Sequence, residues 1–115
     1  LYDSIGADAL IGRPTSVSLS GTGFSNTANA FDLVHAYSNN GGTDTASLFD
    51  GAGNDLFNAI GSFAGLTYGS YSGFAGSQLR LNNFEAVVAR STAGGIDRKT
   101  IAAVDYALIT SGSWV

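Results

Sequence analysis

Two blocks of this chain occur twice, in the same order. The first block, Leu1–Leu10, returns 47 residues later at Leu48–Phe57 and keeps an aromatic-Asp pair, a glycine and a second aspartate. The second block, Ala30–Asp44, returns 53 residues later at Asn83–Asp97 and again ends in a Gly-Gly-x-Asp turn. Duplicated strand-like segments joined by Gly/Asp turns are typical of stacked repeats. The sequence therefore predicts an all-β fold, a parallel β-helix or β-solenoid with degenerate repeats, with an antiparallel β-sandwich as the alternative.

The strand prediction comes from residues that alternate between polar and apolar. Ser16–Ser20 alternates in this way and puts Val17 and Leu19 on one face. When the two copies of the second block are overlaid, four small apolar positions align as interior candidates: Val34 with Val87 and Ala36 with Ala89. The expected strands are 16–20, 31–38, 45–49, 56–60, 78–81, 84–91 and 100–104.

Composition narrows the class of protein. The 115 residues suit one domain, and nine acidic against five dispersed basic residues give a net charge of −4, which argues against a nucleic-acid partner. No apolar run is long enough to span a membrane. Cysteine is absent, which excludes disulfides and thiolate-metal sites.

The two ends of the chain suggest a place in something larger. Methionine is absent and residue 1 is a leucine in the middle of a repeat, so we expect a fragment of a longer precursor. The first rung would then expose a strand edge at Leu1, Tyr2 and Asp3, which we predict to be an assembly edge. The apolar residues 100–115, ending near Trp114, are expected to form a C-terminal cap.

Four Gly/Asp turns resemble a known calcium-binding repeat. Gly51–Phe57 resembles the glycine-rich nonapeptide of the β-roll in RTX-type secreted bacterial proteins, and Gly6–Leu10, Gly41–Asp44 and Gly94–Asp97 are shorter copies. In that family, the carbonyls and aspartates of stacked turns surround calcium. The resemblance therefore implies that calcium is a candidate cofactor, with these ligands: Asp8, Asp44, Asp55 and Asp97.

The spacing of these turns departs from a β-roll. Asp44 and Asp55 are 11 residues apart, and Asp8 and Asp44 are 36 apart, whereas β-roll repeats follow one another directly. Strands lie about 4.8 Å apart, so turns two rungs apart would be roughly 9.6 Å distant, too far to share an ion coordinated at about 2.4 Å. The alternative to a calcium site is that the carboxylates accept hydrogen bonds from amides of their own turns.

Aromatic residues offer a different kind of contact. The block Phe63–Phe74 mixes rings with Gly and Ser, and its side chains Tyr68, Tyr71 and Phe74 are candidates for stacking on a glycan or a partner chain. The competing interpretation is that these rings fill the core.

Nothing in the sequence defines an active site. His35 is the single histidine, and Asp32 points to the opposite face of the same strand. A polysaccharide lyase set would have to come from Glu85, Arg90, Arg98 and Lys99, which is too sparse to identify one. We therefore predict no catalytic residues and a protein that is not an enzyme.

The opening Leu-Tyr-Asp-Ser and the Gly-Gly-Thr-Asp-Thr-Ala turn look like repeats of large secreted or surface-attached bacterial proteins. This resemblance implies an extracellular or cell-surface location. The predicted function is a non-enzymatic structural module that stacks on neighbouring repeats or partner chains. The alternative is a surface module that binds calcium or a polysaccharide.

Overall fold

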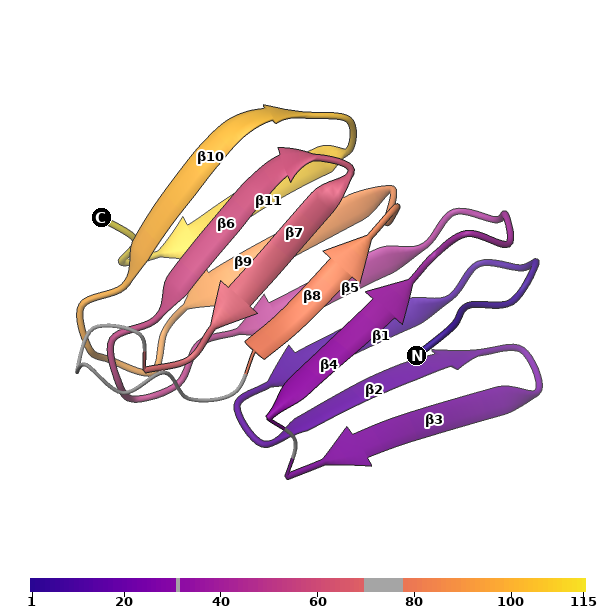
Figure 1. The fold of residues 1–115 in the computed structure, drawn as a ribbon, viewed down its shortest axis with the longest axis horizontal. Coiled ribbons are helices and arrows are strands. Elements are labelled where there is room, and N and C mark those ends of the chain that lie inside the picture. Colours follow the sequence, from indigo (N-terminus) through magenta and orange to yellow (C-terminus); the bar gives the residue numbers. More distant parts are fainter. Residues whose placement is uncertain (31, 70–77) are drawn as a thin grey trace.

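The computed structural model describes residues 1–30, 32–69 and 78–115, and every regular element within these ranges is a β-strand (Figure 1). Among these residues, no helix is long and apolar enough to cross a membrane. The strands are β1 (Ala9–Arg13), β2 (Ser16–Gly21), β3 (Phe24–Asn29), β4 (Leu33–Tyr37), β5 (Thr45–Phe49), β6 (Leu56–Gly61), β7 (Phe63–Thr67), β8 (Gln78–Asn82), β9 (Ala86–Ser91), β10 (Arg98–Val104) and β11 (Ala107–Gly112).

The strands form two mixed sheets. The six-stranded sheet has the order β11-β9-β5-β1-β2-β3, in which the first four strands are parallel and β1-β2-β3 are antiparallel. The five-stranded sheet has the order β10-β6-β7-β8-β4, with parallel pairs at both ends and an antiparallel β6-β7-β8 centre. The N-terminal segment extends this second sheet, because Tyr2 bridges to Tyr37 of edge strand β4 in parallel.

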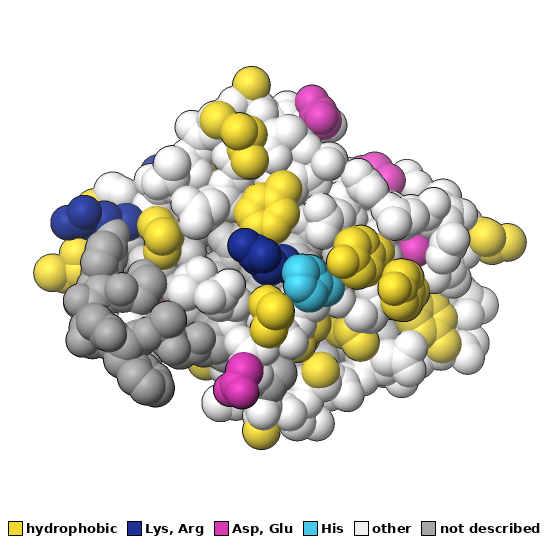
Figure 2. Space-filling model, viewed as in Figure 1, with side chains coloured by type: hydrophobic (Ala, Val, Ile, Leu, Met, Phe, Trp, Pro, Cys, Tyr) yellow, Lys and Arg dark blue, Asp and Glu magenta, His cyan; other side chains and the backbone are white. Residues whose placement is uncertain are grey.

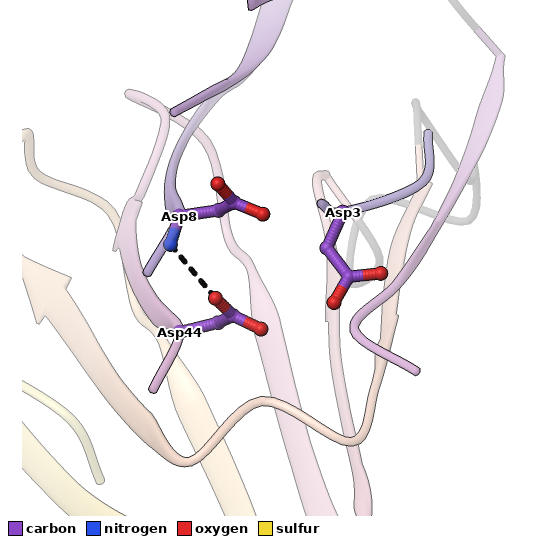
Figure 3. Close-up of side chains that lie close together, drawn as sticks. All are labelled: Asp3, Asp8 and Asp44. Carbon is purple, nitrogen blue, oxygen red and sulfur yellow. Dashed lines mark hydrogen bonds between the residues drawn. The ribbon is translucent and has the colours of Figure 1, made fainter. Parts of the chain in front are cut away.

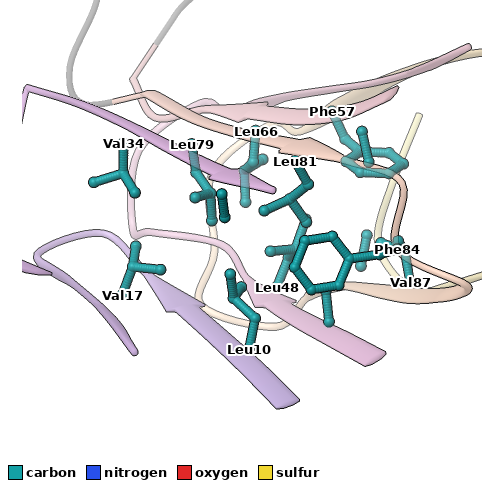
Figure 4. Close-up of a cluster of buried hydrophobic side chains, with 14 of the residues drawn as sticks. Leu10, Val17, Val34, Leu48, Phe57, Leu66, Leu79, Leu81, Phe84 and Val87 are labelled. Atoms are coloured by element: carbon teal, nitrogen blue, oxygen red, sulfur yellow. The ribbon is translucent and has the colours of Figure 1, made fainter. Parts of the chain in front are cut away.

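One apolar core lies between the two sheets, which pack face to face (Figure 4). Strand β2 illustrates why. Its alternation buries Val17 and Leu19 completely while the serines between them stay at the surface side. The six-stranded sheet contributes Leu10 and Leu48 to the same core, where they meet side chains from the opposite sheet: Phe57, Leu66, Leu79 and Leu81.

The predicted β-helix is wrong, because the repeated segments do not lie over one another as rungs of a solenoid. Their copies occupy opposite sheets. Leu1–Asp3 lies beside β4 in the five-stranded sheet, whereas its counterpart Leu48–Asp50 runs along β5 into the following turn in the six-stranded sheet. Likewise β4 and its counterpart β9 are in different sheets.

The physical reason for this difference lies between the repeated blocks. Residues there form antiparallel hairpins, β1-β2-β3 in one sheet and β6-β7-β8 in the other, and a parallel solenoid has no place for them. The alternative sandwich has the correct two-sheet packing but the wrong pairing, since both sheets contain parallel pairs.

The expected strands are confirmed to within a few residues, as is the interior assignment of the aligned apolar positions. Val34, Ala36, Val87 and Ala89 are all buried, although they face the core from opposite sheets. Strands β1, β3, β7 and β11 were not expected. Gly and Ser weaken the apolar alternation in the first three, and the residues of β11 were expected only as part of the C-terminal cap.

Residues 100–115 contribute the last strand of each sheet. Strands β10 and β11 lie at the same end of the two sheets, and Trp114 packs against Phe57, with ring centroids 5.9 Å apart. The indole Nε1 of Trp114 donates to the carbonyl of Ala89 at 3.2 Å.

Candidate metal centre

Six aspartates gather in two groups of three. In each group, one carboxylate oxygen of every member lies within 4.8 Å of the others, and all six residues are buried. The two groups are related by the sequence duplication, member by member. Aspartate cluster 1 is Asp3, Asp8 and Asp44, and aspartate cluster 2 is Asp50, Asp55 and Asp97.

Parallel strand pairing brings two members of cluster 1 together. Asp8 directly precedes β1 and Asp44 directly precedes β5, and the two strands run parallel in register. The backbone N–H of Asp8 donates to Oδ1 of Asp44 at 2.7 Å. Asp3 reaches them from the N-terminal segment beside the opposite sheet, so three carboxylates converge from two sheets (Figure 3).

Cluster 2 repeats this arrangement in the other sheet. Asp55 precedes β6 and Asp97 precedes β10, which are again a parallel pair. The N–H of Asp55 donates to Oδ1 of Asp97 at 2.9 Å. Asp50 follows β5 of the six-stranded sheet, so this cluster also joins the two sheets.

The carboxylates also cap turns of the chain. The carboxylate of Asp3 accepts hydrogen bonds from two consecutive backbone amides, and that of Asp50 does the same at equivalent positions, at 2.9 to 3.2 Å. The donors are Asn39 and Asn40 for Asp3, and Thr92 and Ala93 for Asp50. The expected capping of a carboxylate's own turn is found at Asp8, which accepts from the N–H of Ser4, and at Asp55, which accepts from that of Gly51. The amides that Asp3 and Asp50 cap belong to turns distant in sequence.

A serine holds the last aspartate of each cluster. The hydroxyl of Ser38 donates to Oδ2 of Asp44, and the hydroxyl of Ser91 donates to Oδ2 of Asp97 at 2.5 Å. Such hydrogen bonds fix the carboxylate orientation and offset part of the cost of burying a charge.

Two glycines allow the two turns of each cluster to lie in contact with each other. Gly42 has φ +83° and Gly95 has φ +80°, a region that side chains other than glycine rarely adopt. A Cβ at Gly42 would lie 2.1 Å from the carbonyl oxygen of Gly6, and one at Gly95 would lie 2.0 Å from that of Gly53. The Gly-Gly-x-Asp pattern therefore lets each turn contact the other turn of its cluster.

Burial and repulsion between negative charges raise the pKa values of three cluster aspartates, Asp44, Asp50 and Asp55. Burial raises the pKa of Asp44, and the negative charges of Glu85 and Asp3 raise it further, against hydrogen bonds that lower it. Burial is also the first cause of the raised pKa of Asp50, followed in the same direction by Asp97. The pKa of Asp55 is raised by burial and then by the charges of Asp97 and Asp50.

The sequence analysis found four of the six cluster members. It predicted Asp8, Asp44, Asp55 and Asp97, and the spacing argument that kept Asp8 from sharing a site with Asp44 was wrong, because their strands are immediate neighbours. Asp3 was predicted only as an assembly edge, and Asp50 was missed. The conserved aromatic-Asp pair of the duplicated block was the signal that would have identified both.

The other predicted contact residues lie elsewhere. Tyr68 is 5% exposed and its hydroxyl donates to the carbonyl of Phe49 at 2.8 Å, so its ring packs in the core. Tyr71 and Phe74 lie outside the described residues. Leu1 is joined to β4 by its amino group, which donates to the carbonyl of His35 at 2.6 Å.

No protein-family model, curated protein or solved structure matches this chain. Two oxygens on opposite sides of one calcium ion lie about 4.8 Å apart, twice a typical Ca–O distance of about 2.4 Å. The separation of the ligand atoms in each cluster, within 4.8 Å, fits a single shared metal ion.

Proposed function

We propose that this protein is a non-enzymatic β-sheet module that binds one hard divalent cation, calcium being the preferred ion, at each aspartate cluster. The observation that carries the proposal is that three buried carboxylates converge on one point, and that the duplication builds this arrangement twice. Two unrelated turns would rarely accumulate the same three acids, the same capped amides and the same serine.

The ligand set favours a hard cation. Carboxylate oxygens suit calcium, magnesium and manganese, whereas zinc and copper prefer nitrogen and sulfur ligands. Neither cluster contains histidine, and the chain has no cysteine. Calcium accepts six to eight oxygens in irregular geometry, so backbone carbonyls and water can complete the shell around three carboxylates.

The bound ion would hold the two sheets together. Each cluster draws one aspartate from one sheet and two from the other, so a shared ion links both sheets at that point. Burying three carboxylates without a counter-ion is costly, which agrees with the raised pKa values of Asp44, Asp50 and Asp55. A divalent ion removes that cost and replaces the disulfides that this chain does not have.

An extracellular or cell-surface location suits this role. Calcium sites of extracellular modules bind with dissociation constants of about 10⁻⁴ to 10⁻³ M. A domain that requires such a site for stability would then be stable where calcium is abundant.

Thermal unfolding with and without calcium tests the proposal. Metal-stripped protein should melt well below protein in excess calcium, since each site gains about 2.7 kcal/mol when the ion is present at a hundred times its dissociation constant. Asp8→Asn and Asp55→Asn should each remove part of the calcium-induced shift. Asp32→Asn, which changes an exposed aspartate outside both clusters, should leave the shift unchanged.

The calcium-induced shift is compared within each variant, so a variant that is simply less stable still reports on binding. Equal melting temperatures with and without calcium in the wild-type protein would refute the proposal. An equal reduction of the shift by Asp32→Asn would refute the assignment of the sites.

A second candidate role is assembly by strand addition, which the sequence analysis predicted at a different edge, that of Leu1, Tyr2 and Asp3. The observation that favours it is the open C-terminal edge, where β10 is exposed along most of its length and Ile101 and Ile109 are 42% and 60% exposed. Exposed edge strands pair readily with other chains. Sedimentation should show association that depends on concentration and that Ile101→Lys abolishes. Ile11→Lys alters an equally exposed isoleucine on inner strand β1 and should have no effect; a monomer at every concentration would exclude this role.

A further inference from the structure

The outer face of the five-stranded sheet carries an open cleft that neither aspartate cluster uses. It has a volume of about 500 Å³ and is lined by residues of β4, β7 and β8: His35, Tyr37, Phe63, Arg80 and Asn82. The register explains this grouping, because His35 pairs with Arg80 and Tyr37 pairs with Asn82 across neighbouring strands. Figure 2 shows the single histidine beside a basic side chain near the middle of this face, with hydrophobic side chains around them.

Aromatic rings extend from this cleft toward the sheet edge. The ring of Tyr37 is stacked with that of Tyr2 on one side, at 5.4 Å between centroids, and with that of His35 on the other, at 6.0 Å. Tyr2 is 68% exposed, so the row continues to the surface. The glycine at position 65 makes room for the ring of Phe63 in the cleft, because a Cβ there would lie 2.7 Å from that ring.

Arg80 places a positive charge in the same cleft. Its guanidinium lies 5.8 Å from the ring centroid of Phe63, and it forms no ion pair with a carboxylate among the described residues. Arg80 is exposed, so its charge can act on a ligand in the cleft. The charge therefore favours an anionic ligand, and the planar fork of arginine matches a carboxylate.

We propose that this cleft binds a uronate-containing polysaccharide. The exposed ring of Tyr2, which is stacked on Tyr37, supplies a flat apolar surface for the face of a sugar ring, Arg80 binds the uronate carboxylate, and the amide of Asn82 hydrogen-bonds to hydroxyls. An open cleft that continues into a row of rings suits a chain passing over the surface more than an enclosed small molecule.

On the corresponding face of the other sheet, the described residues cover the equivalent ring with arginines. Phe49, the counterpart of Tyr2, has guanidinium groups over its ring: Arg13 at 4.5 Å and Arg90 at 5.2 Å from its centroid. Arg90 itself stands where the first repeat has Tyr37. The ring is thus already covered by the protein's own cations, and we expect polysaccharide binding on the five-stranded sheet alone.

Calorimetric titration with a hyaluronan oligosaccharide, which carries glucuronate in every second unit, tests the proposal. A chitin oligosaccharide of the same length is the uncharged comparison, and calcium is kept at one saturating concentration throughout. We expect the hyaluronan oligosaccharide to bind and the chitin oligosaccharide to bind at least about tenfold more weakly. Arg80→Gln should weaken hyaluronan binding about tenfold or more, and Tyr2→Ala about three- to tenfold.

Arg13→Gln is the matched control, since it removes another arginine that lies over a phenylalanine ring, on the opposite sheet. Unchanged binding in this variant supports the site. The proposal is overturned if the hyaluronan oligosaccharide does not bind, if chitin binds equally, or if Arg13→Gln weakens binding as much as Arg80→Gln. Because the metal sites are measured separately by thermal shift, failure here leaves the aspartate clusters unaffected.

Discussion

Aspartate clusters 1 and 2 share their carboxylate geometry but differ in what surrounds it. In cluster 1, the backbone N–H and hydroxyl of Ser4 donate to the carboxylate of Asp8, and the N–H of Asp44 donates to Glu85 at 2.8 Å. In cluster 2, among the residues that the structure describes, the carboxylate of Asp55 accepts from the backbone amides of Gly51 and Gly69, at 2.7 and 2.8 Å.

The two clusters also differ in charge. Glu85 adds a fourth carboxylate beside cluster 1, whereas cluster 2 has the buried ring of Tyr68 close by. Burial and the charges of Asp55 and Asp50 raise the pKa of that phenol. The difference teaches that the duplication preserves the three acids and their caps while the outer environment has diverged. We expect cluster 1 to bind a cation more tightly because it carries more negative charge.

The largest expected effect tests whether the two turns are equivalent. Gly42→Ala and Gly95→Ala should each destabilise the protein by about 1–3 kcal/mol, because both force a side chain into a left-handed backbone and against a carbonyl. Urea unfolding measures both. Gly6→Ala is the control, since its Cβ would make only ordinary contact at 3.7 Å. A loss confined to one of the two variants would break the equivalence of the clusters.

The pH dependence of the metal-free protein has a defined sign. Asp44, Asp50 and Asp55 have folded pKa values above the ordinary value of 3.8, so the folded protein takes up their protons before the unfolded chain does. Stability should rise as the pH falls from about 7 through these raised pKa values, and it should fall again as the pH rises. Melting temperatures measured in a calcium chelator should therefore be higher at about pH 5 than at about pH 7.

Excess calcium should reverse this order, because protons compete with the ion for the same carboxylates. Asp44→Asn should reduce the rise seen in chelator, since one of the titrating groups is then absent. A melting temperature that falls between about pH 7 and pH 5 in chelator would contradict the assignment of raised pKa values to the clusters.

The smallest expected effect concerns the phenol that only the second repeat has. Tyr68→Phe removes the hydroxyl of a buried side chain that donates to the carbonyl of Phe49, and it should cost about 1 kcal/mol. Tyr106→Phe also loses a hydrogen bond of 2.8 Å, to the carbonyl of Phe63, but at a half-buried site where water can substitute. Its cost in thermal unfolding should be lower, and the reverse order would show that burial does not set the difference.

The sequence predicted most of the local structure. Period-two alternation located most strands, and the overlay of the two copies assigned Val34, Ala36, Val87 and Ala89 to the core. Both assignments depend only on which residues share a face of a strand. The two-residue period of a strand determines this. The arrangement of the copies in space could not be obtained in the same way, because hairpins such as β1-β2-β3 decide in which sheet the next copy lies.

The candidate site was predictable in part for the same reason. The Gly/Asp turns identified four aspartates, but the pairing of β1 with β5 and of β6 with β10 determines which of them meet. Asp3 and Asp50 join the clusters through contacts between sheets, and no sequence spacing encodes those contacts. The cleft around Arg80 could not be predicted from the sequence either, because its residues come from three strands that are distant in sequence.

The most direct test of the account is the number of calcium ions bound per chain, measured by calorimetric titration of metal-stripped protein. We predict two ions, one after Asp8→Asn or Asp55→Asn, and none in the double variant, with the tighter of the two sites lost in Asp8→Asn. Absence of binding in the wild-type protein, or two ions still bound by the double variant, would contradict the claim that the duplicated aspartates form two metal sites.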